Sequence, residues 1–164
     1  MTKLYKLTDQ NGQTRNNTQW GPGVEHVASG TGDLCGPGWL HAYTDPRLAL
    51  LMDSVHSDYG PNALLWECEG DGVFKDNNGL KCGVTRLTTL RKIHKPVLTM
   101  EIRVRFAIAC VRIVLNPGVI PEWHLWAEKW LSGEDRSAAA AIAVARAAAT
   151  VEAAAVALAA AIAV

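Results

Sequence analysis

The sequence predicts an α+β protein in which a small mixed or antiparallel sheet domain is joined to docking helices and a long, alanine-rich C-terminal helix. Three observations favour this class. Residues 1–97 alternate short apolar segments with turns that contain Gly and Asn, and residues 98–133 repeat apolar side chains every three or four positions. Residues 134–164 include 17 alanines, all within the final 27 residues, and alanine has the highest helix propensity. We treat these ranges as a β-rich α+β domain, an amphipathic helical pair and an oligomerisation helix.

Strand and turn signals follow one another through the first domain. Residues 3–7 alternate in polarity and are followed by Asn11-Gly12, a tight turn because both residues tolerate positive φ. Thr44 or Asp45 can accept hydrogen bonds from the free amides of a helix that begins at Pro46. We expect further strands at residues 24–28, 38–43, 64–70 and 85–93, and turns at Asp71-Gly72 and Asn77-Asn78-Gly79.

Two ordinary amphipathic helices are expected after Pro96. Thr99 can cap the first, whose apolar side chains repeat at helical spacing. Pro121 suits the first turn of the second helix, on which three tryptophans share one face: Trp123, Trp126 and Trp130. Core packing of these rings is favoured over an exposed recognition stripe, because aromatic burial docks a short helix effectively.

The alanine-rich helix is apolar on nearly all sides, since Ile142 and Val156 lie opposite its apolar seam. A heptad frame assigns the seam to Val144, Ala148, Val151, Ala155, Leu158 and Ile162. We expect this seam to form a helical bundle between copies of the chain. One alternative is membrane association, although the 12 uncharged residues after Glu152 fall short of the roughly 20 that span a bilayer. Another is that the tail is part of a longer repeat.

One aromatic face is the candidate ligand-binding site. Alternation along the strand at 38–43 places Trp39, His41 and Tyr43 together, and Tyr5 belongs to another strand. His41 and Glu69 are weak catalytic candidates, since a histidine titrates near neutral pH and Glu67 and Glu69 share a face. The competing interpretations, which we favour, are a half-buried histidine within an aromatic cluster and a solvent-facing pair of carboxylates.

Composition argues against several functional classes. The 16 basic and 16 acidic residues cancel, so a broad electrostatic surface for nucleic acid is not expected. The four cysteines form no C-x-x-C pair, and the spacing of Cys35, His41, Cys68 and Cys82 is not typical of a metal site. We expect no metal and no cofactor. The first seven residues lack the apolar core of a signal peptide, which predicts a cytoplasmic or virion-associated protein.

Four segments carry a resemblance to known proteins: Leu4–Gly12, Gly38–Pro46, Leu65–Gly70 and Trp130–Ser137. They resemble an uncharacterised phage and bacterial family that joins a small α+β domain of unknown function to an alanine-rich helical extension. This resemblance implies the same architecture and brings no established activity. A looser similarity is to the ADP-ribosyltransferase-like fold. It implies that Tyr5, the His41–Tyr43 strand and Glu67 or Glu69 would hold nicotinamide against aromatic rings and orient the ribose.

The function we expect is that of a non-enzymatic, phage-related structural or interaction protein whose partner is itself. Assembly through the C-terminal helix would turn weak sites on each copy into strong multivalent binding. The first alternative is an ADP-ribosyltransferase-like enzyme or a binder of nucleotides or NAD derivatives. The second alternative is a membrane-associated protein.

Overall fold

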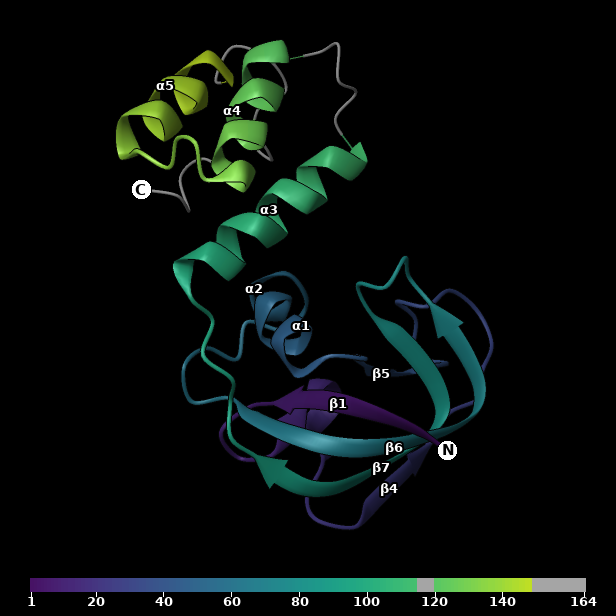
Figure 1. Cartoon of the computed structure of the whole chain (residues 1–164). Coiled ribbons are helices and arrows are strands. Elements are labelled where there is room, and N and C mark those ends of the chain that lie inside the picture. Colours follow the sequence, from purple (N-terminus) through teal and green to yellow (C-terminus); the bar gives the residue numbers. More distant parts are fainter. Residues whose placement is uncertain (115–119, 149–164) are drawn as a thin grey trace. The chain divides into compact units, whose positions relative to one another are not determined.

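The α+β class is confirmed by the computed structural model, which describes the backbone of residues 1–114 and 120–148. An antiparallel sheet and five α-helices lie within these residues (Figure 1). The chain divides into two compact units, residues 1–97 and 98–164. The first unit contains the sheet and two short helices, and the second contains the three remaining helices.

Five strands form the sheet of the first unit. Four of them lie in the order β1 (Thr2–Thr8), β6 (Leu64–Asp76), β7 (Cys82–Ile93) and β4 (Val24–Val27) (Figure 1). The fifth, β5 (Leu40–Ala42), pairs with the first residues of β7, beside the stretch of β7 that β4 occupies. A separate small hairpin consists of β2 (Gln13–Thr14) and β3 (Thr18–Gln19), joined by the 3-10 turn η1 (Arg15–Asn17).

The sheet curls back on itself beside β1. The backbones of Tyr5 and Tyr43 exchange two hydrogen bonds, each 2.8 Å, so β1 meets the residue that follows β5. Inside the curl lies a core of eight buried residues: Leu4, Trp20, Ala42, Trp66, Cys68, Cys82, Val84 and Leu87. Thr8 also points inward, where its hydroxyl oxygen accepts a hydrogen bond of 3.0 Å from the Trp66 indole.

The expected turn at Asp71-Gly72 is not a turn. Strand β6 continues through it to Asp76, with a register shift between Asp71 and Phe74. Gly72 has a φ of 80°, and a Cβ there would lie 2.1 Å from the Thr85 hydroxyl, so glycine permits a bulge at this place. The hairpin reverses instead at Asn77-Asn78-Gly79, as expected, where the Asn77 amide donates to the Lys81 carbonyl at 2.9 Å.

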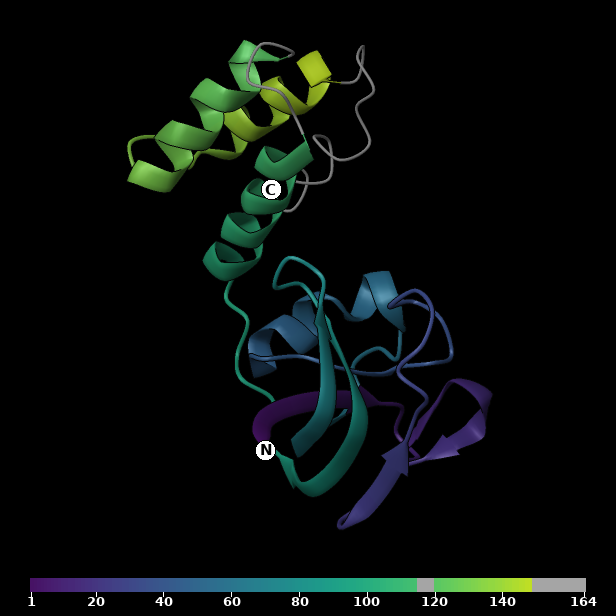
Figure 2. The same cartoon turned by 90° about the vertical axis from the view of Figure 1, so that its right-hand side faces the viewer.

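The two short helices of the first unit are α1 (Pro46–Leu51) and α2 (Asp53–His56), which lie beside the sheet (Figure 2). The predicted helix start is confirmed, because the Asp45 carboxylate accepts a hydrogen bond of 2.7 Å from the Arg47 amide and Pro46 begins α1. Helix α1 contacts β1, and α2 brings His56 toward Tyr43.

The second unit consists of α3 (Met100–Val114), α4 (Pro121–Ser132) and α5 (Ala138–Ala148). Thr99 caps α3 as expected, since its hydroxyl accepts from the Ile102 amide at 3.3 Å. The three helices share one buried cluster, whose members are Val104, Ala107, Ile108, Val111, Ile120, Trp123, Trp126, Ala127, Trp130, Ala141 and Val144. The expected burial of the three tryptophans is confirmed, because each is at most 5% exposed, but they pack within this helical cluster, where the sequence had suggested packing onto the β-rich domain.

Arg136, in the loop after α4, links α4 to α3. Its Nε donates to the Trp130 carbonyl at 2.9 Å, and its guanidinium lies 4.7 Å from the centre of the Trp130 ring. The same side chain donates to Glu101 on α3 at 3.3 Å. The described part of the alanine-rich segment therefore continues the core of the preceding helices, where the sequence had suggested a division at residue 133. None of the described helices is long and apolar enough to cross a membrane.

Candidate functional site

The predicted aromatic face forms on the first unit. Ala42 and Leu40 in β5 contact the core inside the curled sheet, so Trp39, His41 and Tyr43 point outward. Directly opposed residues of an antiparallel pair point to the same side, and the Tyr5–Tyr43 pairing therefore adds Tyr5 to this face. All four residues that the sequence assigned to a ligand-binding surface therefore lie on this side of the sheet, but Trp39 and Tyr43 are buried, with 7% and 6% of their surface exposed.

A loop of the same chain covers much of this face. Leu34 is buried, and its carbonyl accepts a hydrogen bond from Nε2 of His41. The Trp39 indole donates to the Gly32 carbonyl at 3.2 Å. Gly83 makes the close approach possible, because a Cβ at that position would lie 2.5 Å from Leu34 and 3.0 Å from Trp39. Side chains of the loop therefore occupy the space in front of His41 and Trp39.

Burial lowers the pKa of both histidines of this region. The pKa of His41 is lowered mainly by burial, and the ammonium groups of Lys81 and Lys6 lower it further. Burial and the same Lys81 charge also lower the pKa of His56. The Tyr43 hydroxyl lies 2.9 Å from Nδ1 of His56, and burial raises the pKa of this phenol. The lowered pKa values therefore favour the neutral form of both rings.

Two lysines without carboxylate partners are the unusual feature of the site. Lys6 points into the core, where its Nζ donates to the His41 carbonyl at 2.9 Å and lies 4.4 Å from the Trp20 ring. Burial lowers the pKa of Lys6 to about 8. Lys81 is 6% exposed, and its Nζ lies 3.2 Å from the Sγ of the exposed Cys35. Among the described residues, no ion pair joins either ammonium to a carboxylate.

The two weak catalytic candidates lie apart. Glu69 is opposite Thr88 of β7, whereas His41 is opposite Gly83 on the other side of that strand. The two positions are five residues apart on β7, which corresponds to about 16 Å along the strand. The neighbouring Glu67 is held by Lys3 at 3.0 Å and by Arg91 at 3.1 Å, and the hydrogen bond from Lys3 is the main cause of its lowered pKa. No histidine–carboxylate pair for acid–base chemistry is assembled from these residues.

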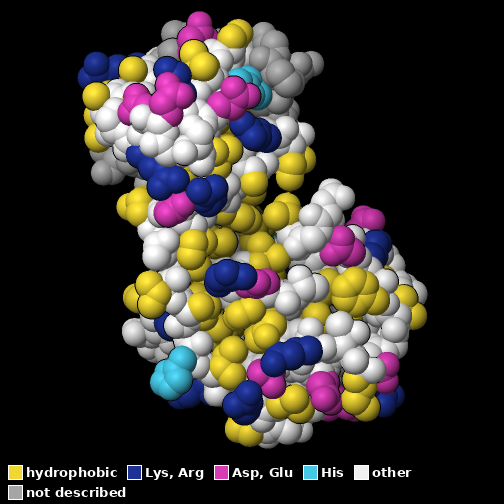
Figure 3. Space-filling model, viewed as in Figure 1, with side chains coloured by type: hydrophobic (Ala, Val, Ile, Leu, Met, Phe, Trp, Pro, Cys, Tyr) yellow, Lys and Arg dark blue, Asp and Glu magenta, His cyan; other side chains and the backbone are white. Residues whose placement is uncertain are grey.

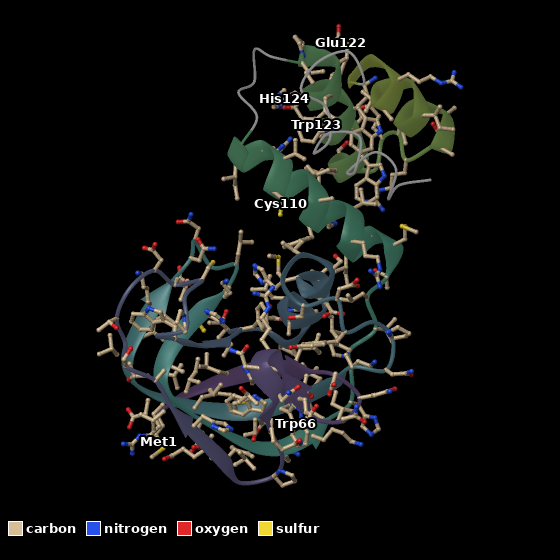
Figure 4. The ribbon with its side chains drawn as sticks, turned by 180° about the vertical axis from the view of Figure 1, so that it is seen from behind. Met1, Trp66, Cys110, Glu122, Trp123 and His124 are labelled. Atoms are coloured by element: carbon tan, nitrogen blue, oxygen red, sulfur yellow. The ribbon has the colours of Figure 1, made fainter. Side chains whose placement is uncertain are left out.

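The described part of the oligomerisation seam is Val144, which is 6% exposed and packs within the helical core of its own chain. Figure 4 labels Trp123 and His124 on α4, and Trp123 belongs to the same core. The remaining seam side chains lie outside the described residues: Ala148, Val151, Ala155, Leu158 and Ile162.

Sequence reasoning missed the lysines of the site. Lys6 had a usable signal, because it lies between Leu4 and Thr8 in the inward register of β1. The pairing of Lys81 with Cys35 had none, since the two residues are 46 positions apart and come together through the path of a loop. His56 was also missed. It is the last residue of α2, the short helix that follows α1 directly.

The described residues of the first unit also include a depression on the sheet. An open depression of about 410 Å³ lies over the bulge of β6 and is lined by Val27, Ala28, Ser29, Asp71, Gly72, Val73, Thr85 and Arg86. On the face drawn in Figure 3, basic and acidic side chains intermix on each unit. The described residues contain no group of three or more His, Cys, Asp or Glu suited to a metal ion. Comparison with protein-family models, curated proteins and solved structures finds no match to this chain.

Proposed function

We propose that this protein is a non-enzymatic, phage-related interaction protein that self-associates through its alanine-rich C-terminal region. The observation that carries the proposal is the one-sided packing of α5. Ala141 and Val144 are buried against the helical core, whereas Ala139, Ile142 and Ala143 are exposed. An apolar helix face in water is a typical site of association.

The length of the alanine-rich segment also supports self-association. Helix α4 has 12 residues and is therefore about 18 Å long at the usual helical rise. The alanine-rich sequence from residue 138 to residue 164 would form a helix of about 40 Å. A neighbour as short as α4 covers less than half of such a helix. We therefore assign the seam positions toward the C-terminus, including Val151 and Leu158, which lie outside the described residues, to contact with a second copy.

The first unit supports a binding role better than a catalytic one. His41 and Glu69 are separated along β7, and His41 is engaged by a backbone carbonyl of its own chain. These observations weigh against the ADP-ribosyltransferase-like alternative. Self-association would present several copies of the first unit together, and a weak contact made by each copy would become strong through multivalency.

Light scattering coupled to size-exclusion chromatography tests the proposal on the full chain. We expect a mass of two or more copies for the native protein. Ile142→Asp, on the exposed face of α5, and Val151→Asp, on the predicted seam, should each reduce the mass to that of one copy, because an unpaired charge within a packed helical interface is strongly destabilising. Val27→Asp is the matched control, since Val27 is 66% exposed on β4 in the first unit. A native protein of single-copy mass, or unchanged mass in both the Ile142 and the Val151 variant, would refute the proposal.

A further inference from the structure

The contact between Cys35 and Lys81 places two nucleophiles side by side on the first unit. Sγ and Nζ are 3.2 Å apart. Cys35 is exposed, so small oxidants in solution reach its sulfur. Lys81 is 6% exposed, and the only hydrogen bond that its ammonium makes within the described residues goes to this sulfur. An ammonium that is nine-tenths buried is therefore aimed at an accessible thiol.

Backbone hydrogen bonds hold both partners in place. The Lys81 carbonyl accepts from the Asn77 amide at 2.9 Å and closes the turn between β6 and β7. Cys35 lies in a turn in which the Gly36 amide donates to the Asp33 carbonyl at 2.8 Å. His41 and His56 are the other titratable groups whose pKa values the Lys81 charge lowers. No carboxylate among the described ion pairs competes for Lys81.

We propose that Cys35 and Lys81 form an oxidation-dependent covalent cross-link, with hydrogen peroxide or another hydroperoxide as the oxidant. In the first step, the Cys35 thiolate attacks one peroxide oxygen. An S–O bond forms while the O–O bond breaks, and sulfur loses the two electrons that reduce the peroxide. The departing hydroxide takes a proton from the Lys81 ammonium and leaves as water. The products are a sulfenic acid on Cys35 and a neutral amine on Lys81.

In the second step, the Lys81 amine attacks the sulfur of the sulfenic acid, as nitrogen nucleophiles are known to do. An S–N bond forms, the S–O bond breaks, and the hydroxyl group leaves with an amine proton as a second water. The result is a sulfenamide that joins the two side chains. Overall, the chain loses two hydrogen atoms, one from the thiol and one from the amine. A thiol reductant reverses the link and restores both groups.

The other cysteines lack this arrangement. Cys68 and Cys82 are fully buried in the sheet core, and burial raises their pKa values to about 12 and about 11. Cys110 is half-buried on α3, and burial raises the pKa of its thiol as well. The reaction is therefore specific to Cys35. The sulfenamide would join the loop that carries Leu34 and Cys35 covalently to Lys81, just before β7, over the aromatic face.

Mass spectrometry of the full chain after treatment with hydrogen peroxide tests the cross-link. We expect a product two hydrogens lighter than the reduced protein, in which the peptide carrying Cys35 is joined to the peptide carrying Lys81. Treatment with dithiothreitol should restore the original mass. Recovery of Cys35 only as a sulfinic acid, or only as a disulfide between chains, would overturn the proposal.

Variants separate the cross-link from simple oxidation of an exposed thiol. Lys81→Arg keeps the positive charge but removes the nucleophilic amine, so Cys35 should be trapped as a sulfenic acid by dimedone and no linked peptide should form. Lys75→Arg is the matched control, because Lys75 belongs to the neighbouring strand and contacts the same loop through Gly32 at 3.1 Å. It should retain the cross-link. A linked peptide in Lys81→Arg would contradict the assignment, and the result for the native chain stands even if that variant fails to fold.

Discussion

Lys6 is a lysine whose side chain is buried in the core of the first unit. Its side chain lies in the core beside Trp20, with one carbonyl as hydrogen-bond partner and no carboxylate among the described ion pairs. Alternation along β1 predicts that it points inward with Leu4 and Thr8. A lysine is nevertheless expected on the surface, because burying its charge is costly. The alternation thus contained the position of Lys6, but the sequence analysis did not use it, because lysine is a residue type expected on the surface.

The stability of the protein should depend on pH through Lys6. Burial lowers its pKa from an ordinary value of 10.5 to about 8. Between these values the unfolded chain binds a proton that the folded chain does not, so the contribution of Lys6 to the unfolding free energy rises with pH. Lys6→Met removes this contribution. The variant should be more stable than the native chain at pH 7. This difference in unfolding free energy should shrink by about 3 kcal/mol as the pH rises from about 8 to 10.5.

Denaturant unfolding of both proteins at pH 7, 9 and 10.5, with a reductant present, measures this difference. Comparison at each pH cancels the opposite contributions of the Cys68 and Cys82 thiols, whose raised pKa values reduce stability above pH 9. A difference between the proteins that does not vary with pH would contradict the assignment to Lys6.

Individual elements were predicted well where local chemistry alone decides them. The cap at Asp45, the cap at Thr99 and the hairpin turn at residues 77–79 form as expected. The bulge at Gly72 was mistaken for a turn, because a glycine with positive φ serves both structures. Which of the two forms depends on pairing with β7, and this information lies outside the local sequence.

Strand β7 packs closely against the loop before β5 at Gly83. Gly83→Ala should destabilise the first unit by about 1–3 kcal/mol, because the added methyl would overlap Leu34 and Trp39. Gly21→Ala is the matched control, since its Cβ would meet its nearest neighbour, in Val24, at 3.7 Å. Thermal unfolding measures both variants. Equal melting temperatures for the two would show that the loop yields to the extra methyl.

At the scale of the whole molecule, the two units have separate cores. The boundary at residue 97 agrees with the end of the predicted β-rich domain, because Pro96 interrupts the strand pattern in the sequence. Which residues meet across the first unit could not be predicted. Cys35 reaches Lys81 through a loop with little regular structure, and neither composition nor periodicity contains such a path.

Separate cores predict that damage to one unit leaves the other folded. Val104→Asp places a charge in the fully buried centre of the helical cluster and should unfold the second unit. Hydrogen exchange followed by mass spectrometry should then show lost protection within residues 98–148 and unchanged protection within residues 1–97. Ala109→Asp, at an exposed position of the same helix, should leave both units protected. Lost protection in both units of the Val104 variant would mean that they fold together.

The backbone link between Tyr5 and Tyr43 has a consequence for solubility. Unpaired edge strands are the usual route by which sheets recruit strands from other molecules and aggregate. Here β1, which would otherwise be such an edge, is bonded to β6 on one flank and to Tyr43 on the other. Among the described strands of the main sheet, the principal edge that remains is β4, four residues long with a glutamate in its sequence. The sheet is thus a poor template for fibril-like growth.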